Sequence, residues 1–130
     1  MRNHTFLGPH RVLPGRLSVS RTFGDIEAKN PQYGGNPHVV IAKPDIKSFE
    51  IETHHDFVVI ACDGVFEKLD NEDVVSVVWE NLKISQPETV HEACGVAVES
   101  VLKSSVARKT LDNITAVVIG FSNLKHCLFP

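Results

Sequence analysis

An apolar run of six residues, "FVVIAC" at positions 57–62, stops abruptly at Asp63-Gly64. Because the run is apolar at odd and even positions alike, it is typical of a strand packed between two layers. A second run, "ITAVVIGF" at 114–121, follows Asp112-Asn113 and predicts another strand. If the two strands are neighbours, both carboxylates lie at one end of a sheet, where oxygen ligands can hold a hard cation such as Mg²⁺ or Mn²⁺. Spacing alone leaves the alternative that Asp63-Gly64 is a plain turn.

Short strands are also expected before residue 57. The segments "RLSVSRTF" (16–23), "HVVIA" (38–42) and "IKSFEIE" (46–52) alternate or are β-branched, which indicates an antiparallel series. Gly24-Asp25 is a turn signal, and residues 26–37 are dense in Gly, Pro and Asn, which predicts an exposed loop.

Two helices are expected between the two strong strands. Asp70 is the predicted N-cap of the first, which should end near Leu82 or Lys83. Ser85 is the predicted N-cap of the second, with Pro87 in the first turn and Glu88 completing a capping box. The apolar stripe of the first helix is Val74, Val75, Val78 and Leu82; that of the second is Val90, Cys94, Ala97, Val101 and Leu102. The segment 122–130 carries no clear signal.

Composition excludes several classes of protein. The net charge is −3, and 13 basic residues are scattered among 16 acidic ones, so nucleic acid is not an expected partner. No apolar run approaches the roughly 18–20 residues of a membrane span, and "MRNHTFLGPH" is too polar for a signal peptide. We therefore expect no membrane partner and a cytoplasmic or nuclear location. Cys62, Cys94 and Cys127 lack CxxC spacing, which favours reduced thiols.

Four segments, in order, carry a family resemblance. They are "GRLSVSRTFGD" (15–25), "AKPDI" (42–46), "VVIACDGVFEKLDNEDVV" (58–75) and "LDNITAVVI" (111–119). Together they resemble the motifs in the C-terminal half of the metal-dependent protein phosphatase 2C family. The match covers residues 11–121.

The resemblance implies an α+β fold, part of a four-layer α-β-β-α sandwich with antiparallel sheets. It implies a binuclear Mn²⁺ or Mg²⁺ centre, at which a metal-activated water attacks phosphoserine or phosphothreonine in a protein substrate. By motif, Asp63 and Asp112 would be direct metal ligands. Glu67 would take a weaker third position, where the family has an aspartate, and its longer side chain leaves that position open.

The resemblance also implies what this sequence lacks. The family's N-terminal half carries a phosphate-binding arginine and a "D-G-H-G-G" segment with a bridging aspartate, and neither occurs here. We therefore expect a partial domain over residues 1–124, a tail over 125–130, low metal affinity, and association through exposed sheet edges. The alternative is an inactive truncated phosphatase-like protein that acts as a binding or regulatory module. A haloacid-dehalogenase-type phosphatase is disfavoured because Ala61 holds the place of its nucleophile.

Two further polar features have alternative interpretations. Arg21 could contact phosphate or form an ion pair with Asp25 or another carboxylate. His54-His55 is expected to be a solvated pair in a turn, since no third metal ligand lies nearby in the sequence.

Overall fold

The computed structural model describes residues 10–129. The signal-peptide prediction concerns residues 1–10, nearly all of which lie outside this range. The chain divides into two compact units, residues 1–49 and 50–130, which are described separately. None of the helices in the described range is long and apolar enough to cross a membrane.

The first unit is built from turns and isolated bridges. Its regular elements are α1 (Ile26–Lys29) and a 3₁₀ turn, η1 (Pro31–Tyr33). Single bridges join Val12 to Leu17 and Arg21 to Ile41. Of the expected short strands, 16–23 and 38–42 reduce to these bridges, and 46–52 has no regular structure. The series of antiparallel strands was therefore wrong: the Arg21–Ile41 bridge is parallel.

Side-chain exposure gives the physical reason for this difference. Ile46, Phe49 and Ile51 are 79%, 68% and 61% exposed, so no apolar layer covers the segment that carries them. A strand needs a hydrogen-bonded neighbour and a covered face to be stable. The predicted loop at 26–37 is mostly exposed, but α1 and η1 interrupt it.

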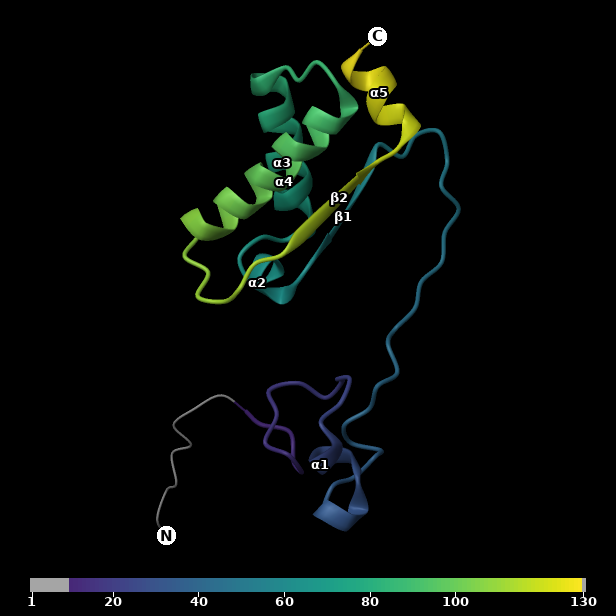
Figure 1. Cartoon of the computed structure of the whole chain (residues 1–130), viewed down its shortest axis with the longest axis vertical. Coiled ribbons are helices and arrows are strands. Elements are labelled where there is room, and N and C mark those ends of the chain that lie inside the picture. The colour runs from purple at the N-terminus through teal and green to yellow at the C-terminus, as the bar shows by residue number, and fades with distance from the viewer. Residues whose placement is uncertain (1–9, 130) are drawn as a thin grey trace. The chain divides into compact units, whose positions relative to one another are not determined.

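The second unit has a two-stranded antiparallel sheet flanked by helices. Strands β1 (Phe57–Ala61) and β2 (Ala116–Gly120) pair from Phe57↔Gly120 to Ala61↔Ala116. The helices are α2 (Asp63–Phe66), α3 (Asn71–Ser85), α4 (Val90–Ala107) and α5 (Ser122–Leu128). In Figure 1, α2 lies at one end of the strands and α5 at the other. This combination of elements confirms the α+β class, while the four-layer sandwich remains a prediction.

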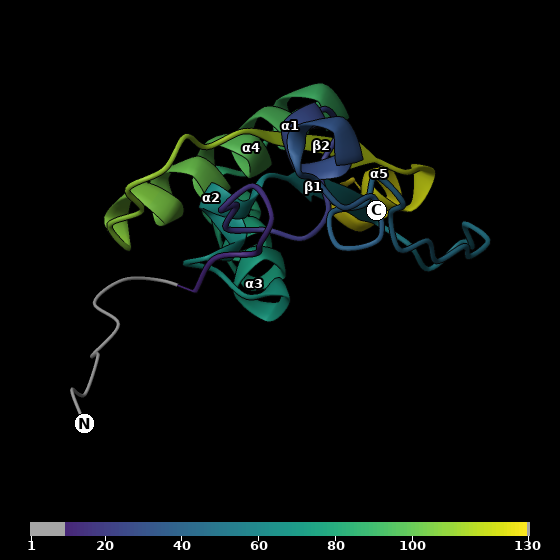
Figure 2. The same cartoon turned by 90° about the horizontal axis from the view of Figure 1, so that it is seen from below.

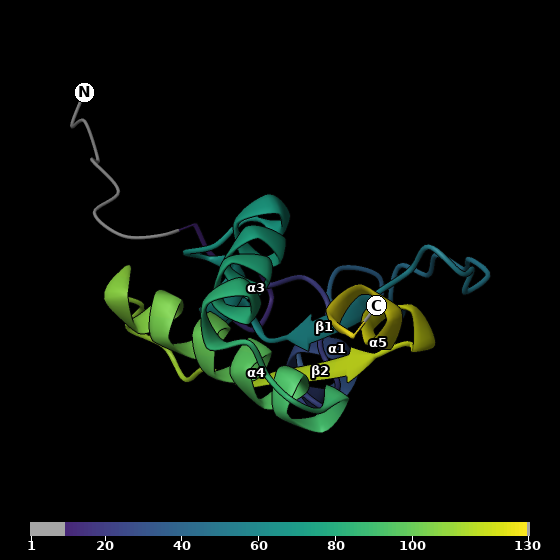
Figure 3. The ribbon, with the colours of Figure 1, turned by 90° about the horizontal axis from the view of Figure 1, so that it is seen from above.

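The core of this unit lies between one face of the sheet and the helices. Helices α3 and α4 pack against each other and α4 packs on β2; Figures 2 and 3 show that the two helices cross rather than run parallel. The buried cluster is Val65, Leu69, Val74, Val78, Leu82, Ala93, Ala97, Val101 and Leu124. Phe57, Val59 and Ala61 of β1 pack against it.

The other face of the sheet is exposed. Ile60, Val117 and Ile119 are 56%, 50% and 46% exposed, so the expected burial of the strand on both faces is not met. The reason is that the described residues provide helices for one face and no second sheet for the other.

The helix predictions hold for α3 and need correction for α4. Asp70 caps α3 in a reciprocal capping box with Asp73, but α3 continues to Ser85, and Val75 is 46% exposed. The N-cap of α4 is Thr89 rather than Ser85. Ser85 is instead the last residue of α3, and Gln86 is its left-handed C-cap, with a φ of 45° and its amide bonded to the Leu82 carbonyl.

Helix α5 was not predicted. Its inward positions are Leu124, which is 1% exposed, and the partly buried Leu128, one helical turn apart. It is tied to the start of β1: the Asn123 side-chain amide donates to Asp56 Oδ1 at 2.6 Å, and the Phe121 amide donates to the Asp56 carbonyl at 2.8 Å. The expected domain boundary at residue 124 falls inside this helix; as a domain boundary it stays a prediction.

Candidate metal centre

Two of the three predicted metal ligands lie on segments that meet at one end of the sheet. Asp63 is the first residue of α2, directly after β1, and Asp112 lies in the loop before β2. Because Ala61 pairs with Ala116 at this end of the antiparallel sheet, the strands are neighbours, as the sequence prediction required. The side chains of Asp63, Asp112 and Glu67 are all exposed.

Cys62 joins the two segments on the strand side. Its backbone amide donates to the Thr115 carbonyl at 3.1 Å. Its thiol donates to the Asn113 carbonyl at 3.2 Å and accepts from the Thr115 amide at 3.3 Å. The thiol is half-buried and has a structural role between the two segments.

Gly64 and Thr110 join the same segments on the helix side. Gly64 is buried, and a Cβ atom there would stand 2.2 Å from the Asn113 carbonyl oxygen. The Thr110 hydroxyl donates to the Gly64 carbonyl at 2.9 Å. Only a residue without a side chain allows the two backbones to approach this closely.

Each predicted carboxylate ligand accepts a hydrogen bond from the following amide. Asp63 Oδ1 accepts from Gly64 N at 3.0 Å, and Asp112 Oδ1 accepts from Asn113 N at 2.7 Å. Within residues 10–129, no lysine or arginine forms an ion pair with these aspartates or with Glu67. Their remaining oxygen lone pairs are available to a cation.

The donors fit part of the coordination sphere of a hard dication. Carboxylate oxygens are the ligands that Mg²⁺ and Mn²⁺ prefer, and such ions take about six oxygens. Across residues 10–129, no group of three or more His, Cys, Asp or Glu residues is placed to hold a metal ion. Water or further carboxylates would have to supply the other ligands.

A bidentate ion pair supports the helices beside this site. Arg108, at the C-cap of α4, donates to the two carboxylate oxygens of Asp73 at 2.6 and 2.8 Å and to the Lys68 carbonyl at 3.0 Å. The hydrogen bonds from Arg108 hold the pKa of Asp73 below its usual value, while desolvation opposes them. This pair links the start of α3 to the end of α4, and both of its residues lie between Glu67 and Asp112 in the sequence.

The other predicted polar residues have partners of their own. Arg21 donates to Asp45 Oδ1 at 2.7 Å and to the Lys43 carbonyl at 3.1 Å, so it forms the ion pair of the second interpretation, with a carboxylate other than Asp25. The rings of His54 and His55 are 4.2 Å apart between centroids, and His54 lies 3.5 Å from a Glu52 carboxylate oxygen.

Sequence reasoning missed Thr110 and the Arg108–Asp73 pair. A hydroxyl two residues before a candidate ligand was a usable signal for Thr110. No spacing rule predicts a contact across 35 residues.

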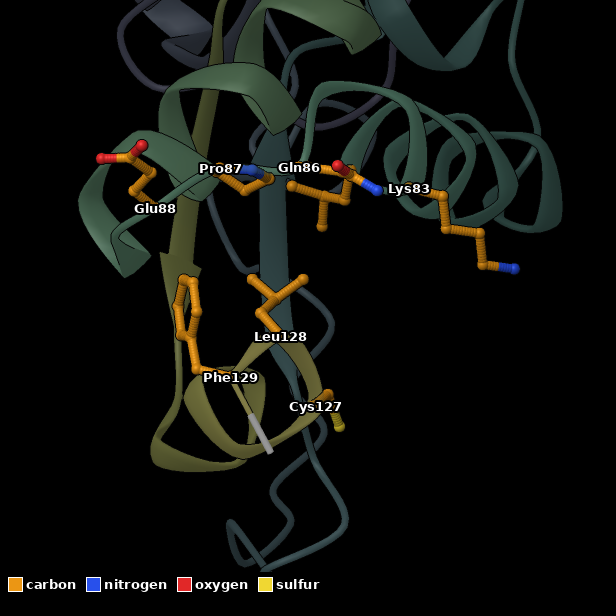
Figure 4. A pocket seen from close by; sticks show the side chains of 8 residues that line it. Lys83, Gln86, Pro87, Glu88, Cys127, Leu128 and Phe129 are labelled. Carbon is orange, nitrogen blue, oxygen red and sulfur yellow. The ribbon is translucent and has the colours of Figure 1, made fainter.

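A separate hollow of about 650 Å³ lies at the α5 end of the unit. Figure 4 shows Leu128 and Phe129 pointing toward the Gln86–Pro87 turn. The residues that line the hollow are Leu82, Lys83, Gln86, Pro87, Glu88, Cys127, Leu128 and Phe129. None of the candidate metal ligands lines it, so it is not part of the candidate centre.

Comparison with known proteins gives one consistent family. The family model described as "Protein phosphatase 2C" matches residues 3–114. "Probable protein phosphatase 2C 4" of Paramecium tetraurelia is 33% identical over 111 residues, which cover 81% of this chain and 36% of that protein. "Probable protein phosphatase 2C 72" of Arabidopsis thaliana is 32% identical over 115 residues, covering 88% of this chain and 32% of that protein.

The matched regions cover most of this chain but only a part of each relative. "Protein phosphatase ppm-1.A" of Caenorhabditis elegans is 33% identical over 109 residues, which cover 82% of this chain and 22% of that protein. The chain thus spans about a third or less of the length of these three curated relatives. Since the family model covers most of its length, the chain belongs to the protein phosphatase 2C family.

Proposed function

We propose that this chain forms part of a protein serine/threonine phosphatase and carries two carboxylate ligands of its metal centre. The observation that carries the proposal is the meeting of the Asp63 and Asp112 segments at one end of the sheet. Membership of the protein phosphatase 2C family supports phosphoproteins as the substrate class. Phosphoserine and phosphothreonine are the residues we expect to be hydrolysed.

The chemistry assigned to this end of the sheet is metal-assisted hydrolysis. A bound Mn²⁺ or Mg²⁺ ion would lower the pKa of a water molecule and offset negative charge on the phosphoryl oxygens. Asp63 and Asp112 would each supply carboxylate oxygen, and Glu67 a further one at a weaker position. Carboxylates that already accept a neighbouring amide are held in orientation before an ion arrives.

The test measures Mn²⁺ binding by the 130-residue chain. Electron paramagnetic resonance reports the concentration of free Mn²⁺ in each titration. We expect weak binding that falls severalfold in Asp63→Asn and in Asp112→Asn. Glu72→Gln is the matched control, because it removes an exposed carboxylate from the first turn of α3. Equal binding by all four proteins would contradict the assigned ligands.

An activity assay tests the claim that this chain forms only part of a phosphatase. The sequence contains neither the "D-G-H-G-G" segment with its bridging aspartate nor the family's phosphate-binding arginine, so we expect no Mn²⁺-dependent hydrolysis of p-nitrophenyl phosphate by this chain above blank. Hydrolysis at an ordinary phosphatase rate, lost in Asp63→Asn, would show that the residues present complete a working site.

A second candidate function, a non-catalytic binding module, is favoured by one observation. The aliphatic side chains of Ile60, Val117 and Ile119 form an exposed sheet face, and such faces mark interaction surfaces. Size-exclusion chromatography with light scattering tests it: self-association lost in Ile60→Thr supports the surface. A monomer at all concentrations argues against association through this face.

A further inference from the structure

We propose that Thr110 is a positioning residue that sets the placement of Asp63 relative to Asp112. This inference rests on the proposed function. It follows from the bonds that cross between residues 62–64 and residues 110–115, which are the two ligand-bearing segments.

Each of the two candidate aspartate ligands lies between residues that bond to the opposite segment. Asp63 lies between Cys62, which bonds to Asn113 and Thr115, and Gly64, whose carbonyl accepts from Thr110. Asp112 in turn lies between Thr110 and Asn113. The two segments are therefore fixed on both sides of both carboxylates.

On the helix side, the Thr110 hydroxyl is the side chain that makes this link. Its Oγ1 donates to the Gly64 carbonyl at 2.9 Å and accepts from the Asp112 amide at 3.4 Å. A hydroxyl can donate one hydrogen bond and accept others at once, so a single atom contacts both ligand-bearing segments. The Thr110 amide donates to the Ser105 carbonyl at 3.2 Å, which anchors the hydroxyl to the end of α4.

Loss of this hydroxyl should act on metal binding more than on the fold. Thr110 lies outside the buried core cluster, and the Cys62 bonds remain in its absence. Groups that orient metal ligands from behind typically change metal affinity by about 10–100-fold when they are removed. Because only one of two links is lost here, we expect the low end, about tenfold.

The experiment compares Thr110→Val, which removes the hydroxyl at nearly equal volume, with Thr110→Ser, which keeps it. Each 130-residue protein is labelled with ¹⁵N and titrated with Mn²⁺, and paramagnetic broadening of the Asp63 and Asp112 amides gives the affinity. Hydrogen exchange of the Asp112 and Asn113 amides is measured without metal. Thr89→Val is the matched control, since it removes the N-cap hydroxyl of α4.

We expect Thr110→Val to weaken Mn²⁺ binding about tenfold and to speed exchange at Asp112 and Asn113. Thr110→Ser should restore both quantities, and Thr89→Val should leave both unchanged. The role of Thr110 is overturned if Thr110→Val has the Mn²⁺ affinity and the amide exchange rates of the wild type. It is also overturned if Thr110→Ser does not restore the wild-type affinity and exchange rates. If the wild-type aspartates do not respond to Mn²⁺, the proposed metal site fails, and the exchange rates alone decide whether Thr110 holds the segments together.

Discussion

Gly64→Ala is the substitution for which the structure gives the sharpest expectation. The added Cβ would lie 2.2 Å from the Asn113 carbonyl oxygen, whereas real Cβ atoms essentially never approach closer than 3.0 Å, so the backbones must separate by about 0.8 Å. The obstructing atom belongs to the backbone and cannot rotate away. Overpacking of this kind costs about 1–3 kcal/mol. The cost exceeds the gain that alanine brings to a helical position, about 0.5–1 kcal/mol.

Urea denaturation followed by circular dichroism at 222 nm measures this difference. After the alanine gain is subtracted, the net loss is about 0.5–2 kcal/mol, which lowers the urea midpoint by about 0.5–2 M at an m-value of about 1 kcal/mol/M. Gly95→Ala is the matched control: Gly95 lies inside α4 with no neighbouring atom within 4 Å of an added Cβ, so this variant should gain about 0.5–1 kcal/mol. If Gly64→Ala proves as stable as Gly95→Ala, the close approach of the two loops is refuted.

Three further substitutions test the core, the ion pair and the α5 contact. Leu82→Ala, at a side chain that is 1% exposed, should cost about 2–5 kcal/mol in the same urea assay; a loss below 1 kcal/mol would contradict its place in the core. Arg108 lowers the pKa of Asp73 in the folded state. The contribution of Asp73 to the free energy of unfolding is therefore present above the usual carboxyl pKa and is lost as the pH falls through the lowered pKa. Arg108→Met should therefore weaken the pH dependence of stability below about pH 4, and an unchanged acid profile would show that the pair contributes nothing. The pKa of the Cys127 thiol is raised by desolvation first and then by the hydrogen bond to Asp56. Asp56→Asn should therefore speed the alkylation of Cys127 by iodoacetamide at pH 8. An alkylation rate equal to that of the wild type would exclude the contact.

The candidate site could be predicted in outline because its residues follow strong local signals. Two apolar β-branched runs, each next to an aspartate, predicted two strands and the end of the sheet at which their carboxylates lie. Asp70 and the helical spacing of Val74, Val78 and Leu82 predicted α3. Local signals suffice here because hydrogen-bonding geometry and side-chain periodicity act over a few residues.

The same reasoning failed where a segment depends on partners far along the chain. Residues 46–52 have the alternation of a strand, but a strand is stable only when another strand pairs with it, and the sequence of one strand does not contain its partner. Helix α5 forms where Asn123 and Phe121 bond to Asp56, 67 and 65 residues earlier. No pattern within residues 122–128 indicates that contact.

The sequence by itself determined the family, the strongest strands and the residue types of the candidate centre, because these depend on neighbours in the chain. Only the tertiary structure decided that β1 pairs with β2, that Cys62 and Thr110 bond across to the other ligand segment, and that Gly64 lies against the Asn113 carbonyl. The physical reason is that hydrogen bonds and close contacts depend on distance in space. Here residues about 50 positions apart become neighbours when the two strands pair.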